Sequence, residues 1–305
     1  MIRTPDDSGS SPVPVLEIGG THVTAALVDL GAGRVLEPRR SELDSQGARQ
    51  DILDVLIRAA GVLGARERWG VAIPGPFDYE GGTGSFTGVG KFGALAGLDL
   101  GAALSSALPG GPDVVFVNDA DAFGLGEAAA GAARGHRRSV GITLGTGVGS
   151  AFVADGAAVN HGPDVPPDGS AHLVRWEGRG LEETVSRRAI RDRYETRTGR
   201  RPDVREIATL ARAGEPDAVA VLEEAFVVLG RAMAPWVRRF RPGVVVVGGS
   251  IAGSFDLVAG PLRHGLALAE PTLAVPVREA MHPHAALVGA ACHAMGVGPT
   301  CSVRT

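Results

Sequence analysis

Cysteine is scarce in this sequence, and long apolar runs are absent. Its 305 residues include two cysteines, Cys292 and Cys301, which lack the paired spacing of a structural zinc site or a disulfide framework. No run reaches the roughly 18 to 20 apolar residues that a membrane span requires, and the polar, acidic N-terminal segment is unlike a signal peptide. We therefore expect a cytoplasmic protein without a membrane partner.

A strong net charge is also lacking. The formal net charge is -4 and charged residues make up 21% of the chain, which excludes the dense basic surface that gathers nucleic acid. We expect no nucleic-acid partner and chemistry on a small molecule. The length fits two lobes of roughly 120 to 180 residues each.

Glycine, in contrast, is abundant. The 45 glycines stand in short groups between apolar runs, a pattern typical of tight turns where the backbone approaches a ligand. Two of these groups lie between paired apolar runs and predict β-hairpins that turn on Gly19-Gly20-Thr21 and on Gly145-Thr146-Gly147. The recurrence indicates a duplicated architecture whose two lobes face one cleft.

These two turns have the composition of a phosphate site. Glycines let backbone N–H groups surround an anion, and a threonine hydroxyl can donate to phosphate oxygens. Each turn alone could equally be a hairpin without a ligand, and neither matches the P-loop or the Rossmann pattern. A third group, Gly248-Gly249-Ser250, follows an apolar strand and offers either a flat surface for a nucleoside or a plain strand-to-helix turn.

Asp119 is the candidate for acid–base chemistry. It follows Asn118 after a short apolar strand and precedes an alanine-rich helical segment, so its carboxylate is expected at the mouth of a sheet, where α/β enzymes bind ligands. A carboxylate near an attacking hydroxyl suits phosphoryl transfer. The alternative is an N-cap of a helix beginning at Ala120, and the two roles can coexist.

Apolar periodicity predicts the remaining elements. Helices are expected over 51–63, 120–133, 181–197, 204–211, 217–240, 255–268 and 285–295. Strands are expected over 15–18, 23–28, 70–73, 114–117, 139–144, 151–153, 244–247 and 273–277. The second lobe is therefore expected to be rich in helices.

Taken in order, six segments resemble the ROK family of bacterial repressors, uncharacterised reading frames and sugar kinases. The resemblance spans about residues 13 to 296 and rests on the segments 17–21, 73–76, 118–128, 144–149, 247–250 and 287–290. It implies an α/β, two-lobed actin-like (ribonuclease H-like) ATPase fold. The lobes would be 14–118, with a returning helix at about 285–298, and 119–284, after a disordered tail at 1–13.

The resemblance also implies roles for the motif residues. Asp119 would be the general base of an ATP-dependent sugar kinase, and Asn118, His172 and Glu182 would contact the sugar. ATP would be bound by Gly19, Gly20, Thr21, Gly145, Thr146, Gly147, Gly248, Gly249 and Ser250. Glu17 would hold the Mg²⁺ that accompanies ATP.

The sequence departs from the family pattern at three places. Glu17 stands where the family usually has aspartate, and residues 168–172 lack the expected sugar-binding glutamate before His172. Residues 175–180 contain none of the three cysteines that hold structural zinc in most members, so we predict no zinc and expect packing around Trp176 to order this loop instead.

The expected substrate is a glucose-like hexose phosphorylated at its 6-hydroxyl. The missing glutamate, together with high glycine, alanine and arginine usage, leads to the narrower hypothesis of a kinase for the 3-amino-glucose kanosamine in antibiotic biosynthesis. The resemblance further implies a homodimer. The alternatives are a degenerate sugar- or nucleotide-binding protein and a repressor, although a repressor's DNA-binding unit would need roughly 60 residues before the first strand.

Overall fold

The computed structural model describes residues 11–297, which form two compact units. The first unit takes the described residues up to Ala122 and those from His284 onward, and the second takes Phe123–Pro283. Most of the expected tail, residues 1–10, lies outside the described residues, as do Cys301 and the end of the expected returning helix. Val13 corrects the tail's predicted boundary, because it is buried and pairs with Val28 in a strand.

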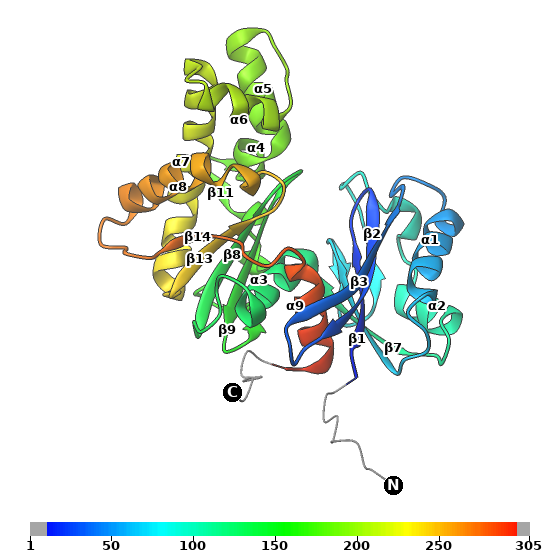
Figure 1. Cartoon of the computed structure of the whole chain (residues 1–305). Coiled ribbons are helices and arrows are strands. Elements are labelled where there is room, and N and C mark those ends of the chain that lie inside the picture. The colour runs from blue at the N-terminus through cyan, green and yellow to red at the C-terminus, as the bar shows by residue number, and fades with distance from the viewer. Residues whose placement is uncertain (1–10, 298–305) are drawn as a thin grey trace. The chain divides into compact units, whose positions relative to one another are not determined.

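A five-stranded sheet in the order β3-β2-β1-β4-β7 forms the centre of the first unit (Figure 1). β1 (Val13–Ile18), β2 (His22–Asp29) and β3 (Arg34–Glu42) are antiparallel neighbours, whereas β4 (Arg68–Ile73) and β7 (Asp113–Asn118) extend the sheet in parallel from β1. The carboxyl ends of β1, β4 and β7 therefore lie at one edge of the sheet, where α/β proteins place ligands.

Helices cover both faces of this sheet. α1 (Arg49–Gly61) and α2 (Leu100–Ala107) lie on one face and α9 (Ala285–Met295) on the other (Figure 1). α9 approaches β4 so closely that a Cβ atom at Gly70 would collide with the carbonyl oxygen of Ala290. The loop after β4 carries one short pair of strands, β5 (Phe77–Asp78) and β6 (Thr83–Gly84), and the 3-10 turn η1 (Gly93–Leu95).

The second unit repeats the same sheet topology. Its order is β10-β9-β8-β13-β14, again three antiparallel strands followed by two parallel ones. The strands are β8 (Arg138–Leu144), β9 (Val148–Ala154), β10 (Ala157–Ala158), β13 (Val244–Gly248) and β14 (Val277–Glu279). In each unit, the first two strands of the sheet are antiparallel neighbours that meet at a glycine-containing turn.

The second unit carries most of the helices. They are α3 (Asp119–Ala130), which starts in the first unit, α4 (Glu182–Val185), α5 (Arg187–Thr198), α6 (Val204–Arg212), α7 (Pro216–Phe240) and α8 (Phe255–Ala269). α7 and α8 meet through Gly230 and Gly265, where any Cβ atom would collide with the backbone of the opposite helix. Among residues 11–297, no helix is both long and apolar enough to cross a membrane.

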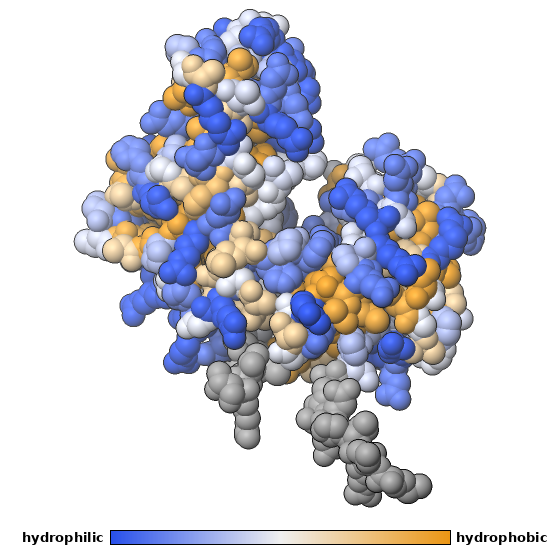
Figure 2. All heavy atoms as spheres, viewed as in Figure 1, coloured by the Kyte–Doolittle hydropathy of each residue, from blue (hydrophilic) through white to orange (hydrophobic). Residues whose placement is uncertain are grey.

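The surface over α5 and α6 is mostly hydrophilic (Figure 2). Arginines of this region pair with neighbouring carboxylates, as in the contact between Arg201 Nη1 and Glu195 Oε2 at 3.0 Å. Apolar side chains of α5, α6 and α7 point inward to the core of the unit, which includes Ile190, Ile207 and Phe226. This separation of polar and apolar faces is what holds the helices on the unit.

Glu127 is a buried carboxylate, 1% exposed, on α3. Its Oε2 accepts hydrogen bonds from the backbone N–H of Ala132 at 2.6 Å and of Met281 at 3.1 Å, while Oε1 accepts from His282 N–H at 2.8 Å. These bonds satisfy a group that would otherwise be costly to bury. They also tie the beginning of the second unit to its end.

The structure corrects several predicted elements. The helix expected over 181–197 is two helices, because Ser186 leaves the helical conformation and its hydroxyl caps α5 by accepting from Ala189 N–H. The strand expected over 273–277 begins only at Val277. β3 and α2 were not predicted; β3 is an edge strand that is largely exposed, so it lacks the apolar alternation of a half-buried strand.

Candidate active site

The first glycine turn, Gly19-Gly20-Thr21, joins β1 to β2. Gly19 N–H donates to His22 O at 2.9 Å and closes the turn. A neighbouring segment supports it from behind, because Leu43 N–H donates to Thr21 O at 3.0 Å and Ser45 N–H donates to Gly20 O at 3.3 Å. The hydroxyl of Thr21 stays on the exposed side.

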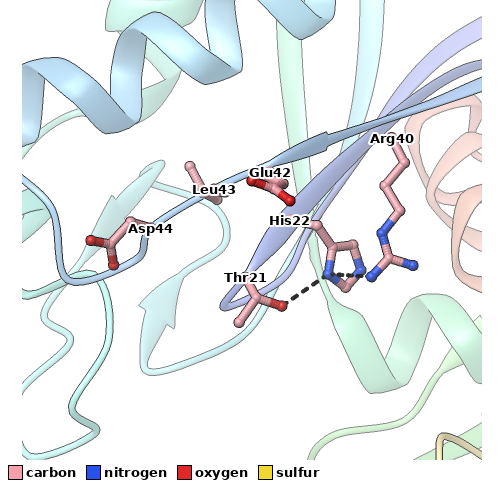
Figure 3. Close-up of a pocket in the computed structure, with 6 residues that line it drawn as sticks. All are labelled: Thr21, His22, Arg40, Glu42, Leu43 and Asp44. Atoms are coloured by element: carbon pink, nitrogen blue, oxygen red, sulfur yellow. Dashed lines mark hydrogen bonds between the residues drawn. The ribbon is translucent and has the colours of Figure 1, made fainter.

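A polar hollow of about 730 Å³ opens beside this turn (Figure 3). It is lined by Thr21, His22, Arg40, Glu42, Leu43 and Asp44. Arg40 Nη2 lies 3.0 Å from His22 Nδ1, and Thr21 Oγ1 lies 3.2 Å from the same atom. Arginine can only donate, so Nδ1 is the acceptor and the ring proton sits on Nε2. Burial and the charge of Arg40 lower the pKa of His22, so Arg40 carries the positive charge of this pair at neutral pH.

Glu17 lies on β1 just before the turn. Burial raises the pKa of its carboxyl, the nearby charge of Asp119 raises it further, and Arg40 opposes both. Two carboxylates that raise one another's energy in a partly buried place form a donor set that suits a divalent cation. Among residues 11–297, no group of three or more histidine, cysteine or acidic side chains gathers to hold a metal alone. The donor set therefore fits Mg²⁺ that brings phosphate oxygens as further ligands.

Asn118 ends β7 and Asp119 begins α3. Asn118 Oδ1 accepts from Ala120 N–H at 2.9 Å and from Asp121 N–H at 3.3 Å, so Asn118 caps the helix. The alternative raised from the sequence gave this role to Asp119 with a helix beginning at Ala120. One oxygen of Asp119 does accept from Ala120 N–H at 2.9 Å, and its carboxylate stands at the positive end of the helix dipole.

Tyr79 is a site residue that sequence reasoning missed. Its hydroxyl accepts from Asn118 Nδ2 at 2.8 Å and donates to Ile73 O at 3.3 Å, which fixes the amide of Asn118. Burial raises the pKa of Tyr79, and the charges of Asp119 and Asp121 add to the rise, so the hydroxyl stays protonated. The available signal was that Tyr79 is one of two tyrosines and follows the 73–76 motif closely.

The second glycine turn, Gly145-Thr146-Gly147, joins β8 to β9 in the second unit. Gly145 N–H donates to Gly147 O at 3.0 Å. Glu182 Oε1 accepts from Val148 N–H at 3.2 Å and occupies the space that a Cβ atom at Gly147 would need. The structure therefore brings Glu182, expected from the resemblance to contact sugar, to the second glycine turn.

The third glycine turn, Gly248-Gly249-Ser250, lies against the second. Gly249 has φ +91°, and a Cβ atom there would collide with the backbone of Leu144. Ser250 Oγ would lie 3.3 Å from a Cβ atom on Gly145. At Gly248 the space is filled by the ring of Phe123, so this glycine serves packing of the unit. Two glycine-rich turns thus adjoin within one unit, and the backbone of one leaves no room for a side chain on the other.

His172 lies on the 3-10 turn η3 (Ala171–Leu173), and its side chain is exposed. Buried Ser150 fixes the segment before it: Ser150 Oγ donates to Gly169 O at 2.6 Å and accepts from Ala171 N–H at 2.8 Å. Within residues 11–297, no hydrogen bond joins the ring of His172 to Glu182. The turn that carries His172 is thus fixed while its ring points to solvent.

The loop after His172 forms the two-stranded ribbon β11 (Arg175–Trp176) and β12 (Arg179–Gly180). Trp176 is partly buried against the core of the second unit. The guanidinium carbon of Arg231, on α7, stands 4.9 Å from the centre of its ring. Side-chain packing of this kind contributes to ordering the loop.

Comparison with known proteins identifies the family. A model of the ROK family matches residues 14–296. The curated glucokinase of Thermotoga maritima is 26% identical over 273 residues, which cover 81% of this chain and 84% of that enzyme. The chain spans about half the length of some other curated relatives.

Solved structures agree with this match. A ROK hexokinase from Thermus thermophilus has a TM-score of 0.77 and 28% identity, covering 93% of this chain and 97% of that one. A ROK family glucokinase from Streptomyces griseus, solved with glucose and AMPPNP, has a TM-score of 0.75 and 24% identity over 93% of this chain and 99% of that one. The chain therefore belongs to the ROK family and has the actin-like fold of these kinases.

Proposed function

We propose that this chain transfers the terminal phosphate of ATP to a hydroxyl of a hexose or amino sugar, with Asp119 as the general base. The chain is an ATP-dependent sugar kinase, as its similarity to curated glucokinases and ROK kinases supports. The observation that carries the assignment to Asp119 is its position at the start of α3, next to Asn118, which caps the helix, and close enough to Glu17 for its charge to raise the pKa of that carboxyl.

The residues that we propose to bind the nucleotide come from both units. In the first unit, Gly20 and Thr21 would offer N–H and hydroxyl donors to phosphate oxygens at the turn that Gly19 closes, with Arg40 adding positive charge nearby. In the second unit, Gly145, Thr146 and Gly147 would bind phosphate, and Gly249 and Ser250 would support the nucleoside, with Gly248 packing beneath. Glu17 would hold Mg²⁺, which when bound supplies positive charge to the phosphates.

The chemical step needs one base and good alignment. Asp119 takes the proton of the attacking sugar hydroxyl while the oxygen of that hydroxyl bonds to the terminal phosphorus. The bond from that phosphorus to the bridging oxygen of ADP breaks. Tyr79 holds the Asn118 amide, so that Asn118 presents a fixed donor to the sugar. The carboxylate of Asp119 stands at the N-terminus of α3, where the helix dipole favours negative charge.

For the sugar, we propose a glucose-like ring phosphorylated at the 6-hydroxyl, contacted by Asn118, His172 and Glu182. Residues 168–172 contribute no glutamate next to His172, so a sugar whose ring carries an amine at that edge, such as kanosamine, is the narrower candidate. We also propose a homodimer, as the family resemblance implies. Light scattering on the purified protein measures that state directly.

The test is ADP release from purified protein with Mg²⁺-ATP and a panel of sugars: glucose, mannose, fructose, glucosamine, N-acetylated amino sugars and kanosamine. We expect turnover with at least one sugar and a loss of about 100-fold or more in kcat for Asp119→Asn, with sugar and nucleotide still bound. ATP binding without turnover on any sugar would instead favour a degenerate binding protein.

A further inference from the structure

Lys91 is the only lysine among the 30 lysine and arginine residues of the chain. It stands in the loop between β6 and η1 of the first unit, and its side chain is half-buried. Every other cationic side chain, apart from the histidines, is an arginine. A single exception to such a uniform choice calls for a physical reason at this position.

The backbone on both sides of Lys91 is fixed. Phe92 is fully buried, and its N–H donates to Ser45 O at 2.6 Å. On the other side, Gln46 Nε2 donates to Gly90 O at 3.1 Å. Ser45 in turn donates its N–H to Gly20 O. The loop that carries Lys91 is therefore bonded to the same segment that supports the first glycine turn.

The side chain of Lys91 extends toward that turn. A Cβ atom placed on Gly20 would lie 4.0 Å from Lys91 Cδ and 3.7 Å from Ser45 Oγ. The methylene stem of Lys91 thus lies beside Gly20, and the ammonium, two bonds beyond Cδ, lies near the turn.

Within residues 11–297, no ion pair involves Lys91; the acid on the adjoining segment, Asp44, uses Oδ1 to accept from Gln46 N–H at 2.9 Å. Some arginines are paired, as Arg212 is with both oxygens of Asp256 at 2.8 and 2.7 Å, whereas others, such as Arg58, have no ion pair among the described residues. A cation without an ion-pair partner among the described residues, beside the first glycine turn, can bind an anionic ligand.

The size of the cation explains why it is a lysine. An ammonium is a compact point charge with three donors, whereas a guanidinium is a wide planar fork that suits flat carboxylate partners. Next to a glycine turn, a tetrahedral phosphate and a narrow cation can occupy the same small space. Arginine here would bring its plane against Gly20 and Ser45.

We propose that the ε-ammonium of Lys91 binds the terminal phosphate of the nucleotide at the first glycine turn and stabilises its charge during transfer. The inference rests on the proposed kinase function, and it adds a cationic ligand outside the glycine motifs. By neutralising the group that carries the developing charge, Lys91 would act more strongly in the transition state than in the ground state.

Because Lys91 is the only ε-amine, an amine-specific reagent reports on it alone. Acetylation by an N-hydroxysuccinimide ester, read by peptide mass spectrometry, would use the N-terminal amine as internal control and the Lys91→Arg protein as the blank. We expect saturating Mg²⁺-AMPPNP to slow acetylation of Lys91 by about tenfold, Mg²⁺-ADP to protect it much less, and the N-terminal amine to be unaffected.

Calorimetry on the same samples separates the two ideas. If AMPPNP binds and Lys91 reacts at its free rate, the Lys91 proposal is overturned while the kinase assignment stands. If no nucleotide binds, both the Lys91 proposal and the kinase assignment are overturned. Equal protection by ADP would also overturn the assignment to the terminal phosphate.

Kinetics supply the second test. Lys91→Met keeps the stem and removes the charge; we expect kcat/KM for ATP to fall about 10- to 100-fold with the KM for sugar within about twofold. Lys91→Arg should restore only part of the loss. The control is Arg58→Met, which removes an exposed positive charge from α1 of the same unit and should leave both constants unchanged. An unchanged Lys91→Met enzyme would refute the proposal; if that variant does not fold, the labelling of the unmodified chain decides.

Discussion

The two units share one strand order but build their glycine turns differently. In the first unit, the turn has room at Gly20 and is ringed by charged side chains, namely Glu17, Arg40 and Lys91. In the second, two turns press against each other, backbone to backbone, at Gly249 and Leu144. The same topology thus builds two kinds of glycine turn, one beside charged side chains and one held by close backbone packing.

The largest effect is expected where the backbones touch. Gly249→Ala would place a Cβ atom on the backbone of Leu144 at a φ that L residues rarely adopt, so we expect a loss of about 3 kcal/mol in the free energy of unfolding, with loss of nucleotide binding. Chemical denaturation measures the first and calorimetry the second. The control is Gly253→Ala, which has open space and should change neither; an equally stable Gly249→Ala protein would break the comparison.

A smaller and different effect is expected at the first turn. Gly20→Ala meets only ordinary contacts, so we expect stability to change by less than about 0.5 kcal/mol. The added methyl would nevertheless stand between the turn and the phosphate, and we expect nucleotide affinity to fall roughly tenfold. Gly61→Ala, at the open end of α1, is the control that should leave affinity unchanged. Loss of stability with affinity retained would contradict the idea of an open, ligand-facing turn.

The smallest effect concerns Glu17 and pH. Because the pKa of Glu17 is raised in the folded state, the folded state binds more protons than the unfolded state between the ordinary carboxyl pKa and the raised pKa. The free energy of unfolding therefore falls as pH rises through this range. Glu17→Gln removes this dependence. We expect the variant to be more stable than the natural chain at pH 8 and the difference to shrink toward pH 4.5, as thermal unfolding without nucleotide would measure. A difference that is constant with pH would show that the charge of Glu17 is not the cause.

Sequence patterns sufficed where local chemistry decides structure. The strands on either side of each glycine turn are apolar, so the hairpins and their recurrence could be predicted. The order of the motifs indicated the family that the comparison confirms. The α/β fold class is confirmed in the same way. Asn118 and Asp119 could be placed at a strand-to-helix junction because the apolar strand before them and the alanine-rich helix after them are both distinct.

The remainder depends on contacts that no local pattern encodes. Tyr79 reaches Asn118 from 39 positions away, and Glu182 reaches Val148 from 34. The break at Ser186 was hidden because a serine cap lies inside an otherwise continuous helical pattern. Gly70 resembles any other strand glycine in the sequence, yet the backbone of α9, more than 200 residues later, leaves no room for a Cβ atom there.

The hydrogen bonds of Glu127 have a consequence for how this chain could arise and be rearranged. The carboxylate of Glu127 accepts hydrogen bonds from the backbone of Met281 and His282, 154 and 155 positions later. It thereby joins the beginning of the second unit, Phe123–Pro283, to its end. A segment whose two ends lie side by side has the connectivity of an inserted module, which can be grafted into a host loop or given new termini without stretching the chain. The second unit therefore has the adjacent ends of an insertable domain, and the hydrogen bonds of Glu127 hold these ends together.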